Sequence, residues 1–407
     1  MKGFPMTLKK QNWSRRKFLK TVGVAGVGSI LSPAQRLLAA SGELETIPTR
    51  SFGKTGEQVS ILSLGGIIDF LSNQLLLKQA LNWGITYWDT AHSYMGGRSE
   101  KGIGKYFTKY PQDRKKIFLV TKSGAWSIKG MTRELNDSLE RMQTDYIDLF
   151  FVHGIRRISA MDDDIKNWGE RAKKEGKIRF FGFSTHSNME ECLQGAAGLG
   201  WIDGIMMTYN YRLMHSDDMR RAVDACVRAG IGLTAMKTQG GGQVQTDSAT
   251  ELELAGRFLQ KGFTDGQAKL KAVWQNTQIA SICSEMPNMT LLMSNMAAAL
   301  DKTQLSARDT SLLQRYAKET RSAYCTGCTA ICESCVEGKA PIGDVMRYLM
   351  YCNSYHDYEL AAEGFNKIPQ KVRRRLTHLD YSKAENECPQ GLPIARLMQE
   401  AKKKLEA

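Results

Sequence analysis

Residues 146–152 read Tyr146-Ile147-Asp148-Leu149-Phe150-Phe151-Val152, an apolar run interrupted by a single carboxylate. A short run rich in aromatic and β-branched residues is typical of a β-strand. The polar residue His153 follows it directly. An apolar strand followed at its carboxyl end by a polar residue is a pattern that recurs along the chain.

Similar strands alternate with helical patterns on both sides of this run. The apolar residues of the helical patterns recur every three or four positions, and glycine often ends such a helix, as at Gly84, Gly176 and Gly230. Eight strand–helix units between about 46 and 300 predict a (β/α)8 barrel, an α/β fold. A doubly wound open sheet is the alternative, but no G-x-G-x-x-G pattern follows the first strand. The other predicted strands are Ile61–Leu64, Ile85–Trp88, Ile117–Val120, Ile178–Phe183, Gly204–Met207, Gly232–Ala235 and Ile279–Cys283. The predicted helices include Leu75–Trp83, Thr132–Met142, Ile165–Lys174, Met189–Ala197 and Asp217–Ala229.

The barrel is expected to occupy residues 46–302, with additions at both ends. Thr49–Ser60, with a turn at Gly53–Gly56, predicts a hairpin that closes the bottom of the barrel. Residues 306–407 differ from the barrel in their sequence pattern. Helical patterns dominate there, and six of the nine cysteines follow residue 324. We expect a small, separate, cysteine-rich helical domain there.

Composition excludes several classes of protein. The 407 residues are 42% hydrophobic and 24% charged, which rules out a mostly disordered chain, a collagen-like fibre and a disulfide miniprotein. Of the net charge of +14, the first 40 residues supply eight positive charges and no negative one, so the remainder carries +6. No basic stripe is interleaved with aromatic residues, so we expect no nucleic-acid partner.

The N-terminus has the layout of a cleavable export signal. Arg15-Arg16 precede Phe18-Leu19, and a short glycine-diluted apolar stretch runs from Val22 to Leu31. Ser32-Pro33-Ala34 and then Leu38-Ala39-Ala40 follow it. Paired arginines in this position resemble the twin-arginine signal, whose export machinery carries folded proteins. We therefore expect residues 1–40 to be removed and the mature protein to be periplasmic or otherwise exported. The apolar stretch is too short to span a bilayer, so no integral membrane protein is expected; an ordinary basic amphipathic helix is the alternative.

Four polar residues are expected at one mouth of the barrel. Asp89 and His153 follow predicted strands, Lys122 ends a strand, and Tyr94 lies in the loop after Asp89. Barrel enzymes place their chemistry at the carboxyl ends of the strands. A phenol could give a proton to a carbonyl oxygen during hydride attack, and a nearby Lys122 would lower the pKa of Tyr94. Asp89 would hold Lys122 charged, and His153 would polarise the substrate oxygen.

These motifs resemble the aldo/keto reductase family. The resemblance rests on Ile85–Ala91 with Tyr94, on Gly97–Glu100, on Val120–Lys122, on Asp145–Leu149 with His153, and on Lys177–Ser184. It implies a (β/α)8 barrel, a nicotinamide cofactor and a catalytic tetrad of Asp89, Tyr94, Lys122 and His153.

The cofactor side departs from the family pattern. Met206 stands where the family often has glutamine before Tyr209-Asn210, and Cys283–Asn288 lacks the usual glycine and basic residue near the phosphates. Glu285 in that stretch makes a preference for NADP doubtful, so the cofactor is expected to be NAD(P)H, with NAD favoured. The candidate cofactor contacts are Ser184, Asn210, Lys237 and Asn288, with Asn295 weaker. Surface or capping roles are alternatives for each.

Substrate contacts are expected in the loops that follow the strands at the mouth of the barrel. Trp126, Arg156 and Arg157 are expected there, and an arginine could hold a carboxylate, a phosphate or a sugar acid. The substrate is then a small carbonyl or sugar-like molecule. Solvated loop charges are the alternative.

The C-terminal cysteines have the spacing of a metal or cluster site. Cys325, Cys328, Cys332 and Cys335 form C-x2-C-x3-C-x2-C, and Cys388-Pro389 comes much later. This region resembles the ferredoxin-like extension of a subgroup of aldo/keto reductases, which implies one [4Fe–4S] cluster held by Cys325, Cys328, Cys332 and Cys388. Cys335 is the substitute fourth ligand. Structural zinc or disulfides, such as Cys335 with Cys352, are alternatives; Cys192, Cys226 and Cys283 are expected to be core residues.

The sequence thus predicts an exported oxidoreductase that moves hydride between a nicotinamide and a carbonyl or alcohol. The alternative is a non-enzymatic or electron-transfer barrel whose cysteine-rich domain docks a redox partner. Cofactor titration separates the two.

Overall fold

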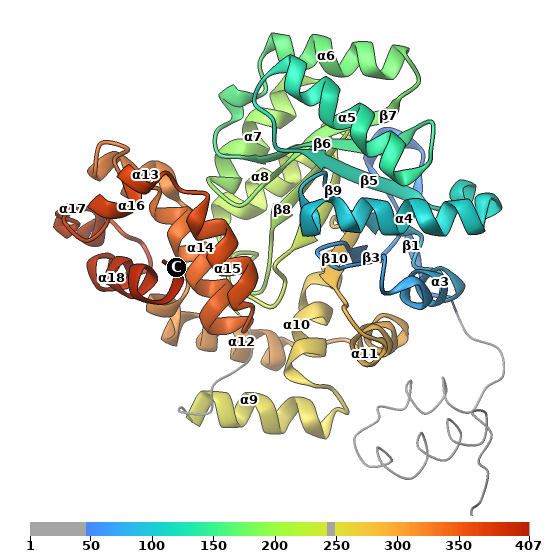
Figure 1. Ribbon diagram of the computed structural model, residues 1–407. Coiled ribbons are helices and arrows are strands. Elements are labelled where there is room, and N and C mark those ends of the chain that lie inside the picture. Colours follow the sequence, from blue (N-terminus) through green and yellow to red (C-terminus); the bar gives the residue numbers. More distant parts are fainter. Residues whose placement is uncertain (1–45, 242–248, 407) are drawn as a thin grey trace, which may run out of the picture.

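Eight parallel strands close into a barrel in the computed structural model, which describes residues 46–241 and 249–406 (Figure 1). The order around the barrel is β10-β3-β4-β5-β6-β7-β8-β9, so chain neighbours pair and the last strand closes on the first. This confirms the predicted (β/α)8 barrel, and the open sheet was wrong. The strands are β3 (Leu62–Gly65), β4 (Tyr87–Asp89), β5 (Phe118–Ser123), β6 (Ile147–Ile155), β7 (Ile178–Thr185), β8 (Gly204–Thr208), β9 (Gly232–Met236) and β10 (Ser281–Glu285).

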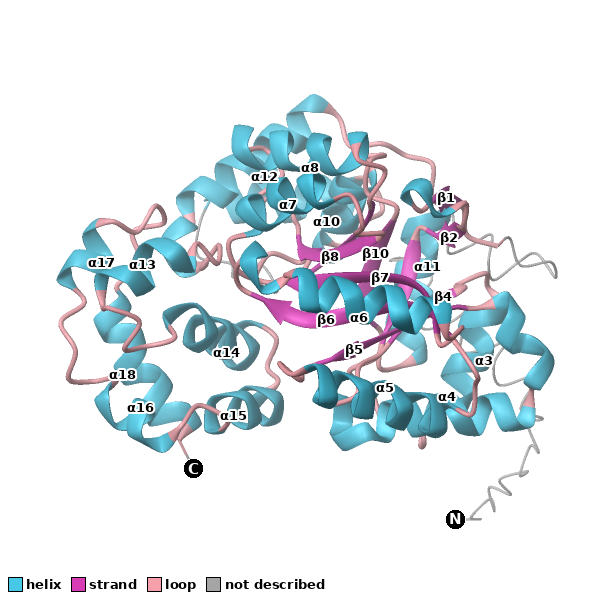
Figure 2. Ribbon diagram, turned by 90° about the horizontal axis from the view of Figure 1, so that it is seen from above, coloured by secondary structure: helices cyan, strands magenta, loops and turns pink. Residues whose placement is uncertain are grey.

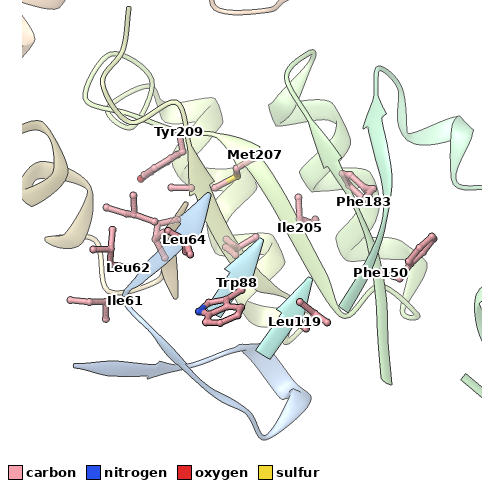
Figure 3. Close-up of a cluster of buried hydrophobic side chains, with 14 of the residues drawn as sticks. Ile61, Leu62, Leu64, Trp88, Leu119, Phe150, Phe183, Ile205, Met207 and Tyr209 are labelled. Atoms are coloured by element: carbon pink, nitrogen blue, oxygen red, sulfur yellow. The ribbon is translucent and has the colours of Figure 1, made fainter. Parts of the chain in front are cut away.

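Helices surround the barrel and cover the outward side chains of its strands. Trp88, Leu119, Phe150, Phe183 and Ile205 lie in this buried layer (Figure 3). Helix starts are fixed locally, because a serine or aspartate side chain accepts a backbone N–H at the first turn of α5, α6 and α8. The helices are α3 (Gln74–Asn82), α4 (Arg98–Lys109), α5 (Ile128–Met142), α6 (Asp163–Lys174), α7 (Met189–Leu199), α8 (Asp217–Arg228), α9 (Ala249–Gln260), α10 (Asp265–Trp274) and α11 (Met289–Leu300).

A hairpin closes the bottom of the barrel, as the sequence predicted. Strands β1 (Thr49–Ser51) and β2 (Gln58–Ser60) pair antiparallel, and the fully buried Phe52 between them contacts Phe118, with 5.4 Å between ring centres. Any Cβ on Gly204 or Gly232 would lie within 3 Å of the Phe52 ring. The first residues of β8 and β9 are therefore glycine because the plug occupies that space.

The C-terminal region is helical and has a core of its own. Its helices are α12 (Ala307–Glu319), α13 (Thr329–Cys335), α14 (Ile342–Ser354), α15 (Tyr358–Asn366), α16 (Gln370–Arg375), α17 (Ser382–Asn386) and α18 (Ile394–Leu405). Its core draws only on residues between Cys332 and Leu405. Helix α12 differs, because Leu312, Leu313 and Tyr316 pack with Leu254 and Phe258 of α9 beside the barrel. We therefore call residues 324–406 the helical region. By its packing this region begins after α12, and not at residue 306 as the sequence analysis expected.

This helical region packs against the carboxyl ends of the strands instead of standing apart (Figure 2). The Asn188 amide nitrogen donates to the Arg156 carbonyl (2.8 Å) and to Thr329 Oγ1 (3.0 Å), and its side-chain oxygen accepts from the Ala330 N–H (3.0 Å). Arg156 also forms ion pairs with Glu333 and Asp344. The mouth of the barrel is therefore lined on one side by α13 and α14. None of the helices in the described ranges is long and apolar enough to cross a bilayer.

Candidate active site

A buried ion pair lies at the mouth of the barrel. Asp89 is the last residue of β4 and Lys122 lies near the end of β5; their side chains are 2% and 1% exposed. Lys122 Nζ donates to Asp89 Oδ1 (2.6 Å) and Oδ2 (2.7 Å) and to the Thr90 carbonyl (2.7 Å). All three protons of the ammonium thus have acceptors, which fixes its position.

Tyr94 and His153 lie beside this pair. The Tyr94 ring comes from a tight turn after β4, in which Met95 and Gly96 have positive φ values of 50° and 60°. Lys122 Nζ lies 4.9 Å from the centre of the Tyr94 ring, and the Tyr94 and His153 rings meet edge to face with 5.6 Å between their centres. The structure therefore brings together the four side chains that the sequence grouped.

Burial sets the protonation of these groups. It raises the pKa of Tyr94 well above its usual value, and the Asp89 carboxylate adds to the effect. This contradicts the expected lowering by Lys122, because removal of the phenolate from water outweighs the nearby ammonium. Burial also lowers the pKa of His153 to about 3, helped by the charges of Lys122, Arg347 and Lys237. At neutral pH the mouth holds a protonated phenol and a neutral imidazole.

Cys283 lies at the same mouth, where the sequence analysis placed only a core residue. Its thiol hydrogen-bonds Asp89, and burial together with the Asp89 carboxylate raises the pKa of the thiol. Its position on the last strand could have indicated this place. Side chains alternate along a strand, so the residue after the outward Ile282 points into the barrel. Cys192 and Cys226 are fully buried in α7 and α8, as expected.

Most of the candidate cofactor contacts are already hydrogen-bonded within the protein. Ser184 Oγ accepts from the Gly154 N–H (2.9 Å), and the Asn210 amide nitrogen donates to the Lys237 carbonyl (3.1 Å) and Tyr324 Oη (2.9 Å). Asn288 caps α11, and Asn295 donates to Ser284 Oγ. Capping or structural bonds therefore engage the polar groups of Asn210, Asn288 and Asn295.

Lys237 has a different environment. Its ammonium lies 4.3 Å above the Tyr351 ring of α14, and it lines an open cavity of about 740 Å³. His186 and Thr208 line the same cavity from the barrel, and Tyr324, Cys325 and Arg347 line it from the helical region. Barrel and helical region thus form this cavity jointly.

The three loop candidates for substrate contact have other surroundings. Arg156 is engaged by Glu333 and Asp344, so it attaches the helical region to the barrel. Arg157 is exposed, and Trp126 is 67% exposed. None of them lines the cavity.

Four cysteines line a second, small cavity. Cys325, Cys328, Cys332 and Cys388 line it with apolar neighbours such as Ile342 and Leu392, Cys325 and Leu392 being shared with the larger cavity. The pKa of the Cys332 thiol is raised by burial and then by the other three thiols. Cys335 does not line the cavity, since its thiol donates to the Ile331 carbonyl (3.3 Å) on the exposed side of α13.

The nine cysteines are all free thiols, so the disulfide between Cys335 and Cys352 is not formed. Within residues 46–241 and 249–406, no group of three or more His, Cys, Asp or Glu side chains is placed to hold a single metal ion. The cysteine cavity is therefore not a closed four-ligand site for one ion.

Comparison with known proteins gives a consistent match over the barrel. A model of the aldo/keto reductase family matches residues 63–306. The aldo-keto reductase NECHADRAFT_45914 of Fusarium vanettenii is 28% identical over 236 residues, which cover 45% of this chain and 62% of that protein. The aldo-keto reductase yakc [NADP(+)] of Schizosaccharomyces pombe is 31% identical over 180 residues, covering 41% and 50%. The chain spans about half to two thirds of the length of the curated relatives it matches.

The structural match is to the same fold. The aldo-keto reductase AKR11C1 from Bacillus halodurans, in its holo form, superposes with a TM-score of 0.55 at 23% identity, over 66% of this chain and 96% of that one. The matched family region ends at residue 306, before the helical region begins.

Proposed function

This chain belongs to the aldo/keto reductase family, and from that premise we propose that it catalyses hydride transfer between a nicotinamide and a small carbonyl or alcohol, with Tyr94 as general acid or base. The observation that carries the proposal is the meeting of Tyr94, His153 and the buried pair of Lys122 and Asp89 at the mouth of the barrel. The high pKa of Tyr94 keeps its proton available for a carbonyl oxygen at neutral pH.

Each remaining group supports that proton transfer. Lys122, held by Asp89 and the Thr90 carbonyl, keeps a positive charge next to the Tyr94 ring, so charge that develops on the phenol oxygen is stabilised. His153 is neutral and can donate one N–H to the substrate oxygen without competing as an acid. The role of these side chains is therefore to position the carbonyl and supply its proton.

The residues present fit a nicotinamide dinucleotide in part. Lys237 Nζ faces a cavity, and the Ser184 hydroxyl can still donate its own proton. These two would hold the cofactor, whereas Asn210 and Asn288 are engaged elsewhere. When bound, the nicotinamide supplies or accepts the hydride. The exposed Glu285 at the end of β10 disfavours a further phosphate, so NAD is proposed over NADP, although a relative carries NADP(+) in its name.

The test is Tyr94→Phe, which removes the proton donor and keeps the ring. Turnover of a carbonyl substrate is expected to fall by about 10²–10⁴-fold, because a positioned general acid contributes that much. Dinucleotide affinity, followed by fluorescence titration, is expected to stay within twofold of the unmodified protein, about the scatter of such a titration. Tyr110→Phe, a phenol at the end of α4, is the matched control. Retained turnover in Tyr94→Phe would remove Tyr94 from the mechanism.

For the helical region we propose one [4Fe–4S] cluster held by Cys325, Cys328, Cys332 and Cys388. Support comes from the cavity that these four thiols line together and from their spacing along the chain. Thiolates are the ligands that such clusters require, so these thiols would lose their protons when the cluster binds. The cluster would pass single electrons.

Paired serine variants test this assignment. Cys388→Ser is expected to lose most of the iron and inorganic sulfide of anaerobically purified protein, whereas Cys335→Ser is expected to keep about four of each per chain. Iron and sulfide analysis with visible absorption measures both. Zinc in place of iron, or equal losses in the two variants, would contradict the proposal.

A second candidate function is electron transfer without hydride chemistry. It is favoured by Cys325, which lines both the cysteine cavity and the cavity at the barrel mouth, and by the contact of Tyr324 with Asn210. A redox partner docked to the helical region would then exchange electrons with the cluster. Absence of dinucleotide binding in a calorimetric titration would favour this candidate over the reductase.

A further inference from the structure

The cavity between the barrel and the helical region has an unbalanced charge. Of the residues that line it in the described part of the chain, only Lys237 and Arg347 are charged, and no aspartate or glutamate joins them. The other polar lining groups, including Thr208, Tyr324 and Asn353, are neutral. Two cations that face an open cavity with no carboxylate in its lining favour an anion there.

Arg347 brings this positive charge to the tetrad from a distant part of the chain. It lies on α14, yet its charge acts on His153 and on His186, and it lowers the pKa of both imidazoles. Its electrostatic influence on His153 follows directly after that of Lys122. His186, Thr208 and Lys237 lie at or just after the carboxyl ends of β7, β8 and β9, so the cavity that Arg347 lines opens at the same end of the barrel as the tetrad.

The carboxylates nearest to Arg347 do not neutralise the cavity. Asp344, one turn earlier on α14, accepts from Arg347 Nη2 (2.7 Å) and also faces Arg156 Nη1 at 3.4 Å. Glu333 pairs with Arg156 as well. Asp344 is thus shared between two guanidinium groups, and Arg347 has further N–H donors for a ligand, whereas Glu285, which interacts with Lys237, does not line the cavity.

We propose that this cavity binds the anionic group, a carboxylate or a phosphate, of the carbonyl substrate, and that Arg347 of the helical region selects substrates that carry it. The proposal rests on the reductase function proposed above and names its substrate class. The phosphates of a dinucleotide are the other source of such an anion. They would lie near 283–288, and no residue of that stretch lines the cavity, but Lys237 is also the proposed cofactor contact, so the measurements below compare substrate binding with dinucleotide binding.

The test compares a matched pair of aldehydes, benzaldehyde and para-carboxybenzaldehyde. In Arg347→Met the ratio of kcat/KM for the acid to kcat/KM for the neutral aldehyde is expected to fall about tenfold or more, mainly through KM, because a charge-assisted bond is lost. Arg347→Lys is expected to recover part of the ratio, since it restores charge without the planar fork. Arg157→Met removes an equal charge outside the cavity and is expected to keep the ratio.

A binding measurement separates this proposal from the reductase function. Calorimetric titration of para-carboxybenzaldehyde into Tyr94→Phe, with and without Arg347→Met, needs no turnover. Binding that depends on Arg347 supports the proposal even if no aldehyde is reduced. An unchanged ratio and unchanged binding overturn it, and so does a loss confined to dinucleotide affinity, because the anion would then belong to the cofactor. Circular dichroism of each variant excludes a folding defect.

Discussion

At the scale of single residues, the chemistry of the mouth depends on which groups keep their protons. Tyr94 is buried next to a buried carboxylate, so it stays protonated, and His153 is buried among cations, so it stays neutral. Both effects favour one protonation state across the physiological range. In the proposed mechanism, Tyr94 would therefore donate a proton and His153 would donate a hydrogen bond as a neutral imidazole, and neither would change its protonation state in this range.

This gives a prediction about pH dependence. An ordinary histidine changes charge near pH 6.5, but the pKa of His153 is lowered to about 3, so its neutral form persists at every pH above about 4. The pH profile of kcat/KM for carbonyl reduction between about pH 5 and 9 is therefore expected to have the same shape in the unmodified protein and in the slower His153→Gln. A limb near pH 6.5 that disappears in His153→Gln would contradict it.

The sequence could predict these four residues because each follows a strand of a barrel whose carboxyl ends meet at one mouth. It could not predict the protonation of Tyr94, since that depends on burial by residues far away in the chain. Arg347 was missed for a related reason. Its helix lies in a region treated as a separate domain, and only the packing of that region on the barrel brings it near His153.

At the scale of elements, hydrogen bonds around the loop between β7 and α7 help to attach the helical region to the barrel. Asn188 lies between β7 and α7 in a left-handed conformation with a φ of 47°, which asparagine tolerates better than most residues. Its side chain contacts Thr329 and Ala330 at the start of α13, and its N–H donates to the Gly327 carbonyl (2.8 Å). Gly327 must be glycine there, because a Cβ would lie 2.2 Å from the His186 carbonyl oxygen.

Asn188→Ala is expected to lower the free energy of unfolding by roughly 2–4 kcal/mol, because it leaves buried partners without hydrogen bonds and puts alanine in a left-handed conformation. Urea unfolding measures the loss. Limited proteolysis is expected to cut first near residues 324–341, where α13 would come away from the mouth. Asn82→Ala, an exposed asparagine on α3, is the control. An unfolding free energy and cleavage pattern equal to the control would contradict this role.

The sequence predicted the barrel elements well because each carries its own signal. Every predicted strand overlaps the observed one, with ends that differ by at most three residues. The plug at Phe52 was visible as a hairpin next to a turn. The place of α12 was not, because its apolar face at Leu312 and Tyr316 matches a surface made by α9, and only the folded chain shows which of two cores it joins.

At the scale of the whole molecule, the helical region and the barrel form one working unit. Cys325 lines both cavities, Arg347 and Lys237 line the larger one from the two parts, and the ion pairs of Arg156 join those parts. The proposed cluster and the proposed substrate pocket would share Cys325 as a lining residue, so they would have to be assembled together. If the protein is exported, it must therefore fold around its cofactors before it leaves the cytoplasm.

The twin-arginine proposal makes this order testable. Arg15 and Arg16 fall within residues 1–45, which lie outside the described residues. Replacing both, as Arg15→Lys with Arg16→Lys, keeps the positive charge that a basic amphipathic helix needs and removes only the paired arginines. In a bacterium with the twin-arginine machinery, the variant is expected to remain in the cytoplasm at full length, whereas the unmodified chain appears shortened in the periplasm. Immunoblots of the two fractions measure this. Equal export of both chains would contradict the twin-arginine assignment, and export of neither chain would favour the basic amphipathic helix.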